Sequence, residues 1–108
     1  MRDLVQRFIQ TTNAFDIGGA LALFAPDAVI DDVSVGDTFA GSAGIRAYLE
    51  RFFVGYNTAS RLLLLEKLDD RTAVVRLDFT GDFGHEIGIL RIAVNSEGLI
   101  ERIDADLE

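Results

Sequence analysis

The 108-residue sequence contains no cysteine, no tryptophan, one proline and one histidine. The absence of cysteine excludes disulfides, thiolate zinc sites and cysteine nucleophiles. Basic residues are also few. Ten Lys and Arg against eighteen Asp and Glu give a formal net charge of -8, which repels phosphate backbones and anionic lipid surfaces. We therefore expect neither nucleic acid nor a membrane as a partner.

Long apolar runs are absent as well. None approaches the roughly 20 residues that a helix needs to span a bilayer. The N-terminus interleaves Arg2, Asp3 and Arg7 with apolar residues, unlike a signal peptide. We expect a soluble, cytoplasmic protein. Hydrophobic residues still make up 49% of the chain, enough for one domain over residues 1–108 to bury a substantial core.

The first quarter of the chain shows helical spacing of its apolar residues. Asp3 followed by Gln6 resembles a capping box and predicts the start of a first helix. Asp16 is expected to cap a second, shorter helix, which Pro26 would stop. The inward stripe of the first helix would consist of Leu4, Val5, Phe8, Ile9, Thr12 and Phe15.

A short strand and a third helix are expected next. β-branched residues predict a strand over residues 28–33, followed by a turn at residues 36–37. Ser42 would cap the third helix, whose end we place at Gly55. Its buried stripe would be Ile45, Tyr48, Leu49, Phe52 and Phe53.

In the second half of the chain the apolar period changes to two, as half-buried strands require. Short turns separate these segments, which predicts an antiparallel meander. Helices first and strands afterwards give an α+β domain whose helices cover one face of the sheet. The expected strands span residues 62–68, 73–80, 86–94 and 99–107.

Two strings carry a resemblance that spans nearly the whole chain. They are LVQRFIQTTNAFDIGGALALFAPDAVIDD at 4–32 and FAGSAGIRAYLERFF at 39–53, followed by the closing strand after the NSEG turn. Both resemble the nuclear transport factor 2-like superfamily, and within it the ketosteroid isomerase and SnoaL-like polyketide cyclase branch. The resemblance implies a cone-shaped, curved antiparallel β-sheet covered by three N-terminal helices, with a mostly apolar pocket between them.

The resemblance also implies site residues. Asp32 falls where the isomerases keep the carboxylate that shuttles a proton on the substrate. The oxyanion-hole tyrosine of the isomerases corresponds here to Phe8, their protonated aspartic acid to about Leu90, and a supporting tyrosine to Leu49. Loss of a single oxyanion donor costs about 2.7 to 4 kcal/mol of transition-state stabilisation. The resemblance therefore implies little steroid isomerase activity.

Asp32 is the main catalytic candidate from the residues themselves. A carboxylate at a strand tip facing an apolar cone loses hydration and becomes a stronger base. The alternative is a solvated aspartate at a strand end. Asp31 would face the opposite way, and neighbouring strand residues that point apart make a poor metal site. We expect no metal, and no motif indicates a nucleotide, flavin or other cofactor.

The remaining candidates are expected to bind substrate or to lie on the surface. The hydroxyls of Tyr48 and Tyr56 are candidate polar contacts, although we prefer the alternative that Tyr48 packs with Phe52 on the helix stripe. His85 is expected to be a solvated hairpin residue. Charged residues of the strands are expected on the outer surface: Arg76, Asp78, Arg91, Arg102, Asp104 and Asp106. The expected pocket wall is Phe8, Phe24, Tyr48, Phe52, Tyr56, Phe79 and Leu90.

Three hypotheses follow, the first two from different classes. The first is a small-molecule pocket protein, an isomerase or cyclase that uses Asp32 for proton transfer on an apolar substrate. The second is a non-catalytic ligand-binding or dimerisation module of the same fold. A third is a small subunit whose function lies in a partner. We also expect a homodimer through the outer face of the sheet, because that face presents Ile87, Ile89, Arg91 and Ala93.

Overall fold

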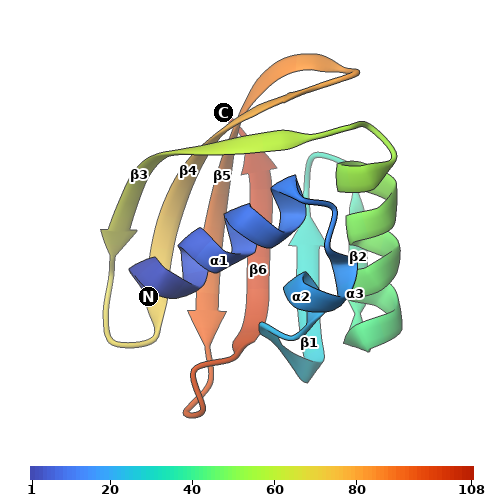
Figure 1. The fold of residues 1–108 in the computed structure, drawn as a ribbon. Coiled ribbons are helices and arrows are strands. Elements are labelled where there is room, and N and C mark those ends of the chain that lie inside the picture. Colours follow the sequence, from blue (N-terminus) through green and yellow to red (C-terminus); the bar gives the residue numbers. More distant parts are fainter.

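The computed structural model describes all 108 residues, in which two helices and two strands precede a third helix and four further strands (Figure 1). The helices are α1 (Arg2–Asn13), α2 (Ile17–Leu21) and α3 (Gly41–Leu49), which continues into a π-helical turn, η1 (Glu50–Val54). The strands are β1 (Phe24–Asp32), β2 (Asp37–Ala40), β3 (Ala59–Lys67), β4 (Thr72–Gly81), β5 (Gly84–Val94) and β6 (Ile100–Leu107). None of the helices combines the length and apolar character needed to cross a membrane.

The six strands form one curved sheet in the order β2-β1-β6-β5-β4-β3. Every neighbouring pair is antiparallel except β1 and β6, which are parallel. The helices lie on one face of this sheet, with α1 across its middle strands and α3 against β1 and β2 (Figure 1). The predicted α+β class, with a meander in the second half and helices on one face, is confirmed.

The core lies between the helices and the concave face of the sheet. Along β4, Ala73, Val75 and Leu77 are buried and alternate with less buried residues, as the period-two pattern predicted. On β5 the buried positions are Gly88, Leu90, Ile92 and Val94. From α1 the stripe contributes Val5, Phe8 and Thr12.

One of the three predicted side-chain caps is confirmed. The Gly19 amide donates to Asp16 Oδ1 at 2.9 Å and so caps α2. The capping box at Asp3 is wrong, because α1 begins at Arg2 and has no side-chain cap bond. Ser42 is not a cap either, since α3 begins at Gly41. There a φ of +71° turns the chain from strand to helix without a side-chain acceptor.

Proline and the end of the first helix also differ from expectation. Pro26 does not stop α2, which ends at Leu21, but lies inside β1. It is tolerated because the pairing of β1 with β6 is interrupted between Phe24 and Val29, so no ladder bond requires its missing amide. The predicted inward position of Phe15 is wrong, because Phe15 follows the end of α1 with a φ of 57° and is 40% exposed.

All the predicted strands except β6 are longer than expected, and β2 was not predicted at all. β1 begins at residue 24 instead of 28, and β3 begins at residue 59 instead of 62. A register shift between Leu62 and Leu64 interrupts the leucine run of β3, leaving Leu63 and Leu64 exposed. The short strand β2 pairs with β1 at the edge of the sheet, where its mostly exposed residues give no period-two pattern.

The side chain of Asn13 ties the end of α1 to β3. Its Nδ2 donates to the Ser60 carbonyl at 3.0 Å, and its Oδ1 accepts from the Ser60 amide at 2.7 Å. The amide side chain thus pairs with the backbone of β3 in the manner of a neighbouring strand. This contact holds an edge strand of the sheet against the helical layer.

We expect Asn13→Ala to lower the free energy of unfolding by about 1–3 kcal/mol, because the backbone groups of buried Ser60 lose their partners. Chemical denaturation measures the change. Gln10→Ala, on the exposed side of the same helix, is the matched control and should stay within about 0.5 kcal/mol of wild type. Equal stability of the two variants would contradict this interpretation of Asn13.

Candidate functional site

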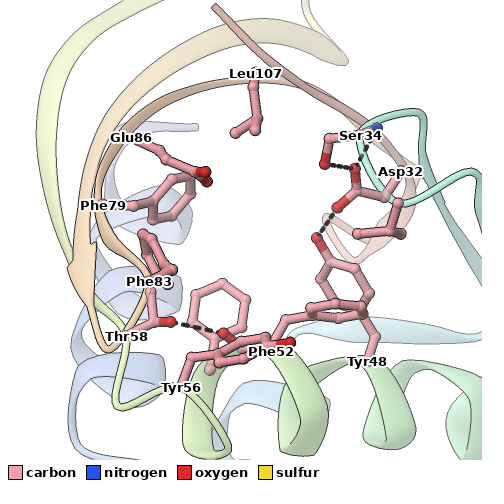
Figure 2. Close-up of a pocket in the computed structure, with 12 residues that line it drawn as sticks. Asp32, Ser34, Tyr48, Phe52, Tyr56, Thr58, Phe79, Phe83, Glu86 and Leu107 are labelled. Atoms are coloured by element: carbon pink, nitrogen blue, oxygen red, sulfur yellow. Dashed lines mark hydrogen bonds between the residues drawn. The ribbon is translucent and has the colours of Figure 1, made fainter.

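A cavity of about 270 Å³ lies between the concave sheet and the segment formed by α3 and η1 (Figure 2). Aromatic side chains form much of its wall, and four polar side chains interrupt them. The rings belong to Tyr48, Phe52, Phe53, Tyr56, Phe79 and Phe83. The polar side chains, apart from the two tyrosines, are Asp32, Ser34, Thr58 and Glu86.

A smaller cavity of about 40 Å³ shares part of this wall. Asp32, Ser34 and Tyr48 line both cavities, so these three residues stand at their junction. The further wall of the small cavity is largely apolar and includes Phe8, Ile30, Leu90 and Ile103. These three polar residues therefore border an apolar inner end of the cavity.

Asp32 is buried, with 6% of its surface exposed, at the end of β1. One carboxylate oxygen, Oδ1, accepts from the Ser34 amide at 3.0 Å and from the Ser34 hydroxyl at 2.5 Å. The other, Oδ2, accepts from the Tyr48 hydroxyl at 2.5 Å. No Lys, Arg or His forms an ion pair with Asp32 within the chain. Neutral donors alone therefore stabilise this carboxylate.

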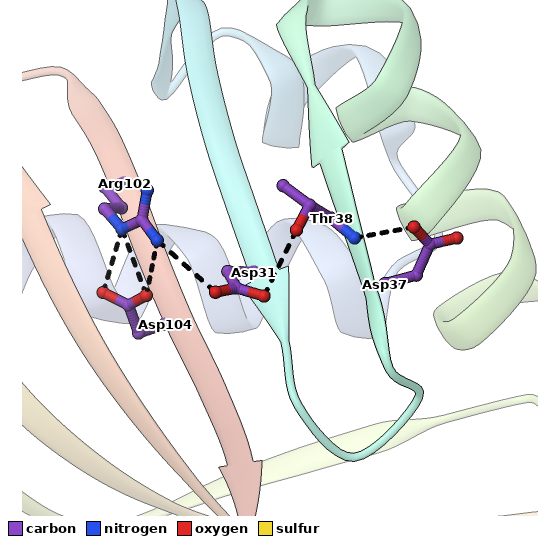
Figure 3. Close-up of polar contacts among 5 residues, drawn as sticks. All are labelled: Asp31, Asp37, Thr38, Arg102 and Asp104. Atoms are coloured by element: carbon purple, nitrogen blue, oxygen red, sulfur yellow. Dashed lines mark hydrogen bonds and ion pairs between the residues drawn. The ribbon is translucent and has the colours of Figure 1, made fainter.

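Asp31, its neighbour, faces the opposite side of the sheet, as the strand pleat predicted (Figure 3). Its carboxylate accepts from the Thr38 hydroxyl at 3.3 Å and lies 3.5 Å from the Arg102 guanidinium. Arg102 in turn pairs with Asp104, whose hydrogen bonds and negative charge raise the pKa of the guanidinium. The network has the outward, solvated position that the sequence predicted.

Tyr48 combines the two roles that the sequence left open. Its ring packs on Phe39 and Phe52, with centroids 5.0 Å apart in each pair. Its hydroxyl donates to Asp32. Burial, and then the hydrogen bond to Asp32 and the charge of Asp32, raise the pKa of the Tyr48 phenol far above its usual range. The hydroxyl therefore stays protonated and remains a donor.

Most of the predicted pocket wall lies around the two cavities. Phe52 and Tyr56 line the large cavity, Phe8 and Leu90 line the small one, and Phe79 lines both. Phe24 does not: it is a buried core residue whose ring meets that of Phe8 edge-on, with centroids 6.1 Å apart. Leu49, assigned from the resemblance, is fully buried in the core.

Sequence reasoning missed three polar residues of the cavity. Ser34 reaches the cavity through a turn in which its amide and its hydroxyl both donate to the Asp32 carboxylate. The Thr58 hydroxyl donates to the Phe52 carbonyl at 2.6 Å, where the chain leaves η1. Glu86 lies on the inward face of β5, two residues before buried Gly88. Extending the alternation of β5 by one step would have found it.

Gly88 leaves room for the Phe79 ring in the cavity wall. A Cβ atom at Gly88 would lie 2.2 Å from Phe79 Cε2, well inside any real contact. The two residues stand on neighbouring strands, β4 and β5, and the ring rests over the glycine. Phe79 therefore keeps its place because residue 88 has no side chain.

The lone histidine lies outside the cavity. His85 is exposed, as predicted, and its Nε2 lies 2.5 Å from Asp78 Oδ1 on the outer face. No three His, Asp or Glu side chains are grouped as a metal site requires. The polar side-chain groups that line the cavity are therefore carboxylates and hydroxyls.

The raised pKa of Tyr48 predicts how stability depends on alkaline pH. A free phenol ionises near pH 10.0, so the unfolded chain loses this proton before the folded chain does. Tyr48 therefore contributes stability that is complete below pH 10 and falls as pH rises above it. Above that pH, the free energy of unfolding of wild type should fall by up to about 1.4 kcal/mol per pH unit more than that of Tyr48→Phe. Chemical denaturation at several pH values measures both. Tyr56→Phe, at an exposed ring, should follow wild type, and parallel curves for wild type and Tyr48→Phe would contradict the assignment.

Solved structures share this fold. A Kribbella flavida protein proposed to be a ketosteroid isomerase superposes with a TM-score of 0.86 at 19% identity, over 99% of this chain and 76% of its own. The epoxide hydrolase/cyclase-like enzyme of pyran ring formation in salinomycin also reaches 0.86 at 19% identity, over 99% of this chain and 89% of its own. A Mycobacterium tuberculosis protein in complex with estradiol-17beta-hemisuccinate superposes with a TM-score of 0.80 at 20% identity, over 94% of this chain and 88% of its own.

At these identities the likeness to solved structures shows the fold. The family model adds a sequence match: the SnoaL-like domain model matches residues 5–99, most of the chain. The curved, open six-stranded sheet with helices on one face agrees with that match. The chain therefore belongs to the SnoaL-like domain family, within the nuclear transport factor 2-like superfamily.

Proposed function

We propose that this protein is an enzyme of the isomerase or cyclase type, in which Asp32 transfers a proton on a small apolar substrate. The observation that carries the proposal is the buried carboxylate of Asp32, without a cationic partner, at the junction of two cavities. Burying a charge without a counter-charge costs free energy. Such groups are found preferentially at functional sites. The turn after β1 does not account for the whole carboxylate, because Ser34 donates only to Oδ1.

The step that this geometry supports is proton transfer at carbon. Asp32 would take a proton from a carbon next to a polarising group and return it at another position of the same molecule. The negative charge that develops on the substrate needs a hydrogen-bond donor. Three of the four hydroxyls lining the large cavity already donate within the chain, those of Ser34, Tyr48 and Thr58. Tyr56 is the fourth and has no partner there, so we assign it the donor role.

Cavity size limits the substrate. Drug-sized ligands occupy pockets of about 300–1,000 Å³, and the large cavity has about 270 Å³. The cavity therefore suits a compound of one or two rings better than a full steroid. Phe8 and Leu90 at the inner end offer no proton to an enolate, so steroid isomerisation is not the reaction that we propose.

A nitrobenzisoxazole probe tests Asp32 without knowledge of the natural substrate. A carboxylate base removes its ring C–H proton, the N–O bond breaks, and the coloured cyanonitrophenolate is released. We expect Asp32→Asn to lower kcat/KM for this reaction by about a hundredfold, since a general base contributes at least that much. Asparagine keeps one acceptor oxygen for Ser34, and its amide nitrogen can donate to the Tyr48 hydroxyl, so the fold should persist.

Asp31→Asn is the matched control, because it removes the same charge one residue away on the opposite face. Its kcat/KM should equal that of wild type. If the two variants lose activity equally, the effect is one of overall charge and the base lies elsewhere. Circular dichroism verifies that both variants are folded.

The second candidate is a ligand-binding module without catalysis. It is favoured by the same count of hydroxyls, because only Tyr56 is free to stabilise a developing negative charge. Proteins of similar structure include a computationally designed 17-OHP binder and a protein in complex with estradiol-17beta-hemisuccinate. A probe that binds in the cavity and is not converted by wild type would favour this candidate.

We further propose a homodimer through the face of the sheet that no helix covers. Ile87, Ile89 and Ala93 lie on this face of β5 and are only partly buried. Arg91, on the same face, forms no ion pair within the chain. A two-fold contact would bury the apolar residues and bring Arg91 near Asp106 of the partner subunit.

Sedimentation at micromolar concentration tests the dimer. Wild type should sediment with twice the mass of the chain, and Ile89→Glu should sediment as a monomer, because it places a charge at the centre of the apolar face. Gln10→Glu adds the same charge on exposed α1 and should remain dimeric. A monomeric wild type would refute the proposal.

A further inference from the structure

The large cavity contains negative charge and no positive charge. Its charged residues are Asp32 and Glu86, and no Lys, Arg or His lines it. Figure 2 shows the two carboxylates on opposite sides of the cavity, with Glu86 turned inward from the sheet. A ligand in this cavity therefore lies between two acidic groups.

Strand geometry fixes the position of Glu86. It shares the inward face of β5 with Gly88 and Leu90, and it stands directly across from Phe79 on β4. Its carboxylate makes no hydrogen bond and no ion pair within the chain, whereas the adjacent His85 pairs with an aspartate on the outer face. The charge of Glu86 is thus free to act on a ligand.

The aromatic wall adds a second attraction for positive charge. Six rings surround the cavity, and the faces of aromatic rings attract cations. One of these rings already holds a cation, since the Arg51 guanidinium lies 4.9 Å from the centroid of Phe52. Arg51 is not a lining residue and neutralises neither carboxylate.

We propose that the ligand of this cavity is an apolar amine, whose ammonium group lies between Glu86 and the aromatic rings while its apolar part extends toward Asp32. This inference rests on the proposed small-molecule pocket and specifies the class of compound that enters it. A carboxylate of the same size would meet two like charges in a chain whose net charge is -8. The cavity therefore selects by charge as well as by size.

Three naphthalene compounds of matched size test this charge preference: naphthylmethylamine, naphthylmethanol and naphthoate. The chain has no tryptophan, so no indole emission overlaps the naphthalene emission that reports binding. In low-salt buffer at neutral pH, we expect the amine to bind about tenfold more tightly than the alcohol, and the alcohol more tightly than the carboxylate. Added salt should reduce the preference for the amine.

Glu86→Gln should lower the amine-over-alcohol preference by about threefold, because the Glu86 charge is removed at nearly constant shape. Glu101→Gln is the matched control. It removes the same charge from an exposed position near the start of β6, whereas the cavity lies at the other end of that strand, at Leu107. Its preference should equal that of wild type.

The outcomes separate this inference from the proposed function. If the alcohol binds at least as tightly as the amine, the charge preference is wrong and the apolar pocket stands. If Glu86→Gln keeps the full preference, the assignment to Glu86 is overturned. If none of the three compounds binds, both the amine and the apolar pocket are refuted. A failed nitrobenzisoxazole reaction with preferred binding of the amine would refute catalysis alone.

Discussion

The parallel pairing of β1 with β6 joins the two halves of the chain, and the site depends on its register. It turns Ile30 and Asp32 toward the helices and sets Asp32 beside Ala105, a side chain small enough to leave room at the cavity. Asp31 lies between them and faces the other side. A slip of one residue would exchange the two aspartates, burying the one that now pairs with Arg102 and exposing the other. A single strand register therefore decides which carboxylate lines the cavity.

Burial of that carboxylate without a cation is compensated by neutral donors. Ser34 supplies two of them from the turn after β1, and Tyr48 supplies the third from α3. Tyr48 is held in turn by ring contacts with Phe39 on β2 and Phe52 on η1. Because one hydroxyl both stabilises the charge of Asp32 and connects α3 to β1, the packing of the helical layer and the chemistry of the site are coupled. The π-helical turn that follows α3 continues this aromatic wall toward the cavity mouth.

Much of the fold and part of the site could be predicted because burial on one face imposes a period on the sequence. The inward position of Asp32 follows from Ala28 and Ile30, which share its face of β1. Ser34 could not be found in this way, since it reaches the site through a local turn that leaves no periodic trace. Glu86, by contrast, could have been found by extending the alternation of β5 one step beyond Gly88. Helix starts were predicted least well, because backbone geometry, such as the glycine with positive φ at the start of α3, replaced two expected side-chain caps.

The distribution of polarity over the two cavities restricts how a ligand can lie. Phe8 and Leu90 make the inner end apolar, and Phe8 also packs edge-on against buried Phe53, which leaves that end little freedom to admit water. The groups that can exchange hydrogen bonds or charge with a ligand stand at the junction and toward the mouth, where Tyr56 is 41% exposed. A polar group driven inward would lose its hydration without gaining a partner. A ligand of the proposed kind would therefore enter apolar end first, and its reacting carbon would lie at the depth of Asp32, between the apolar inner end and the polar mouth.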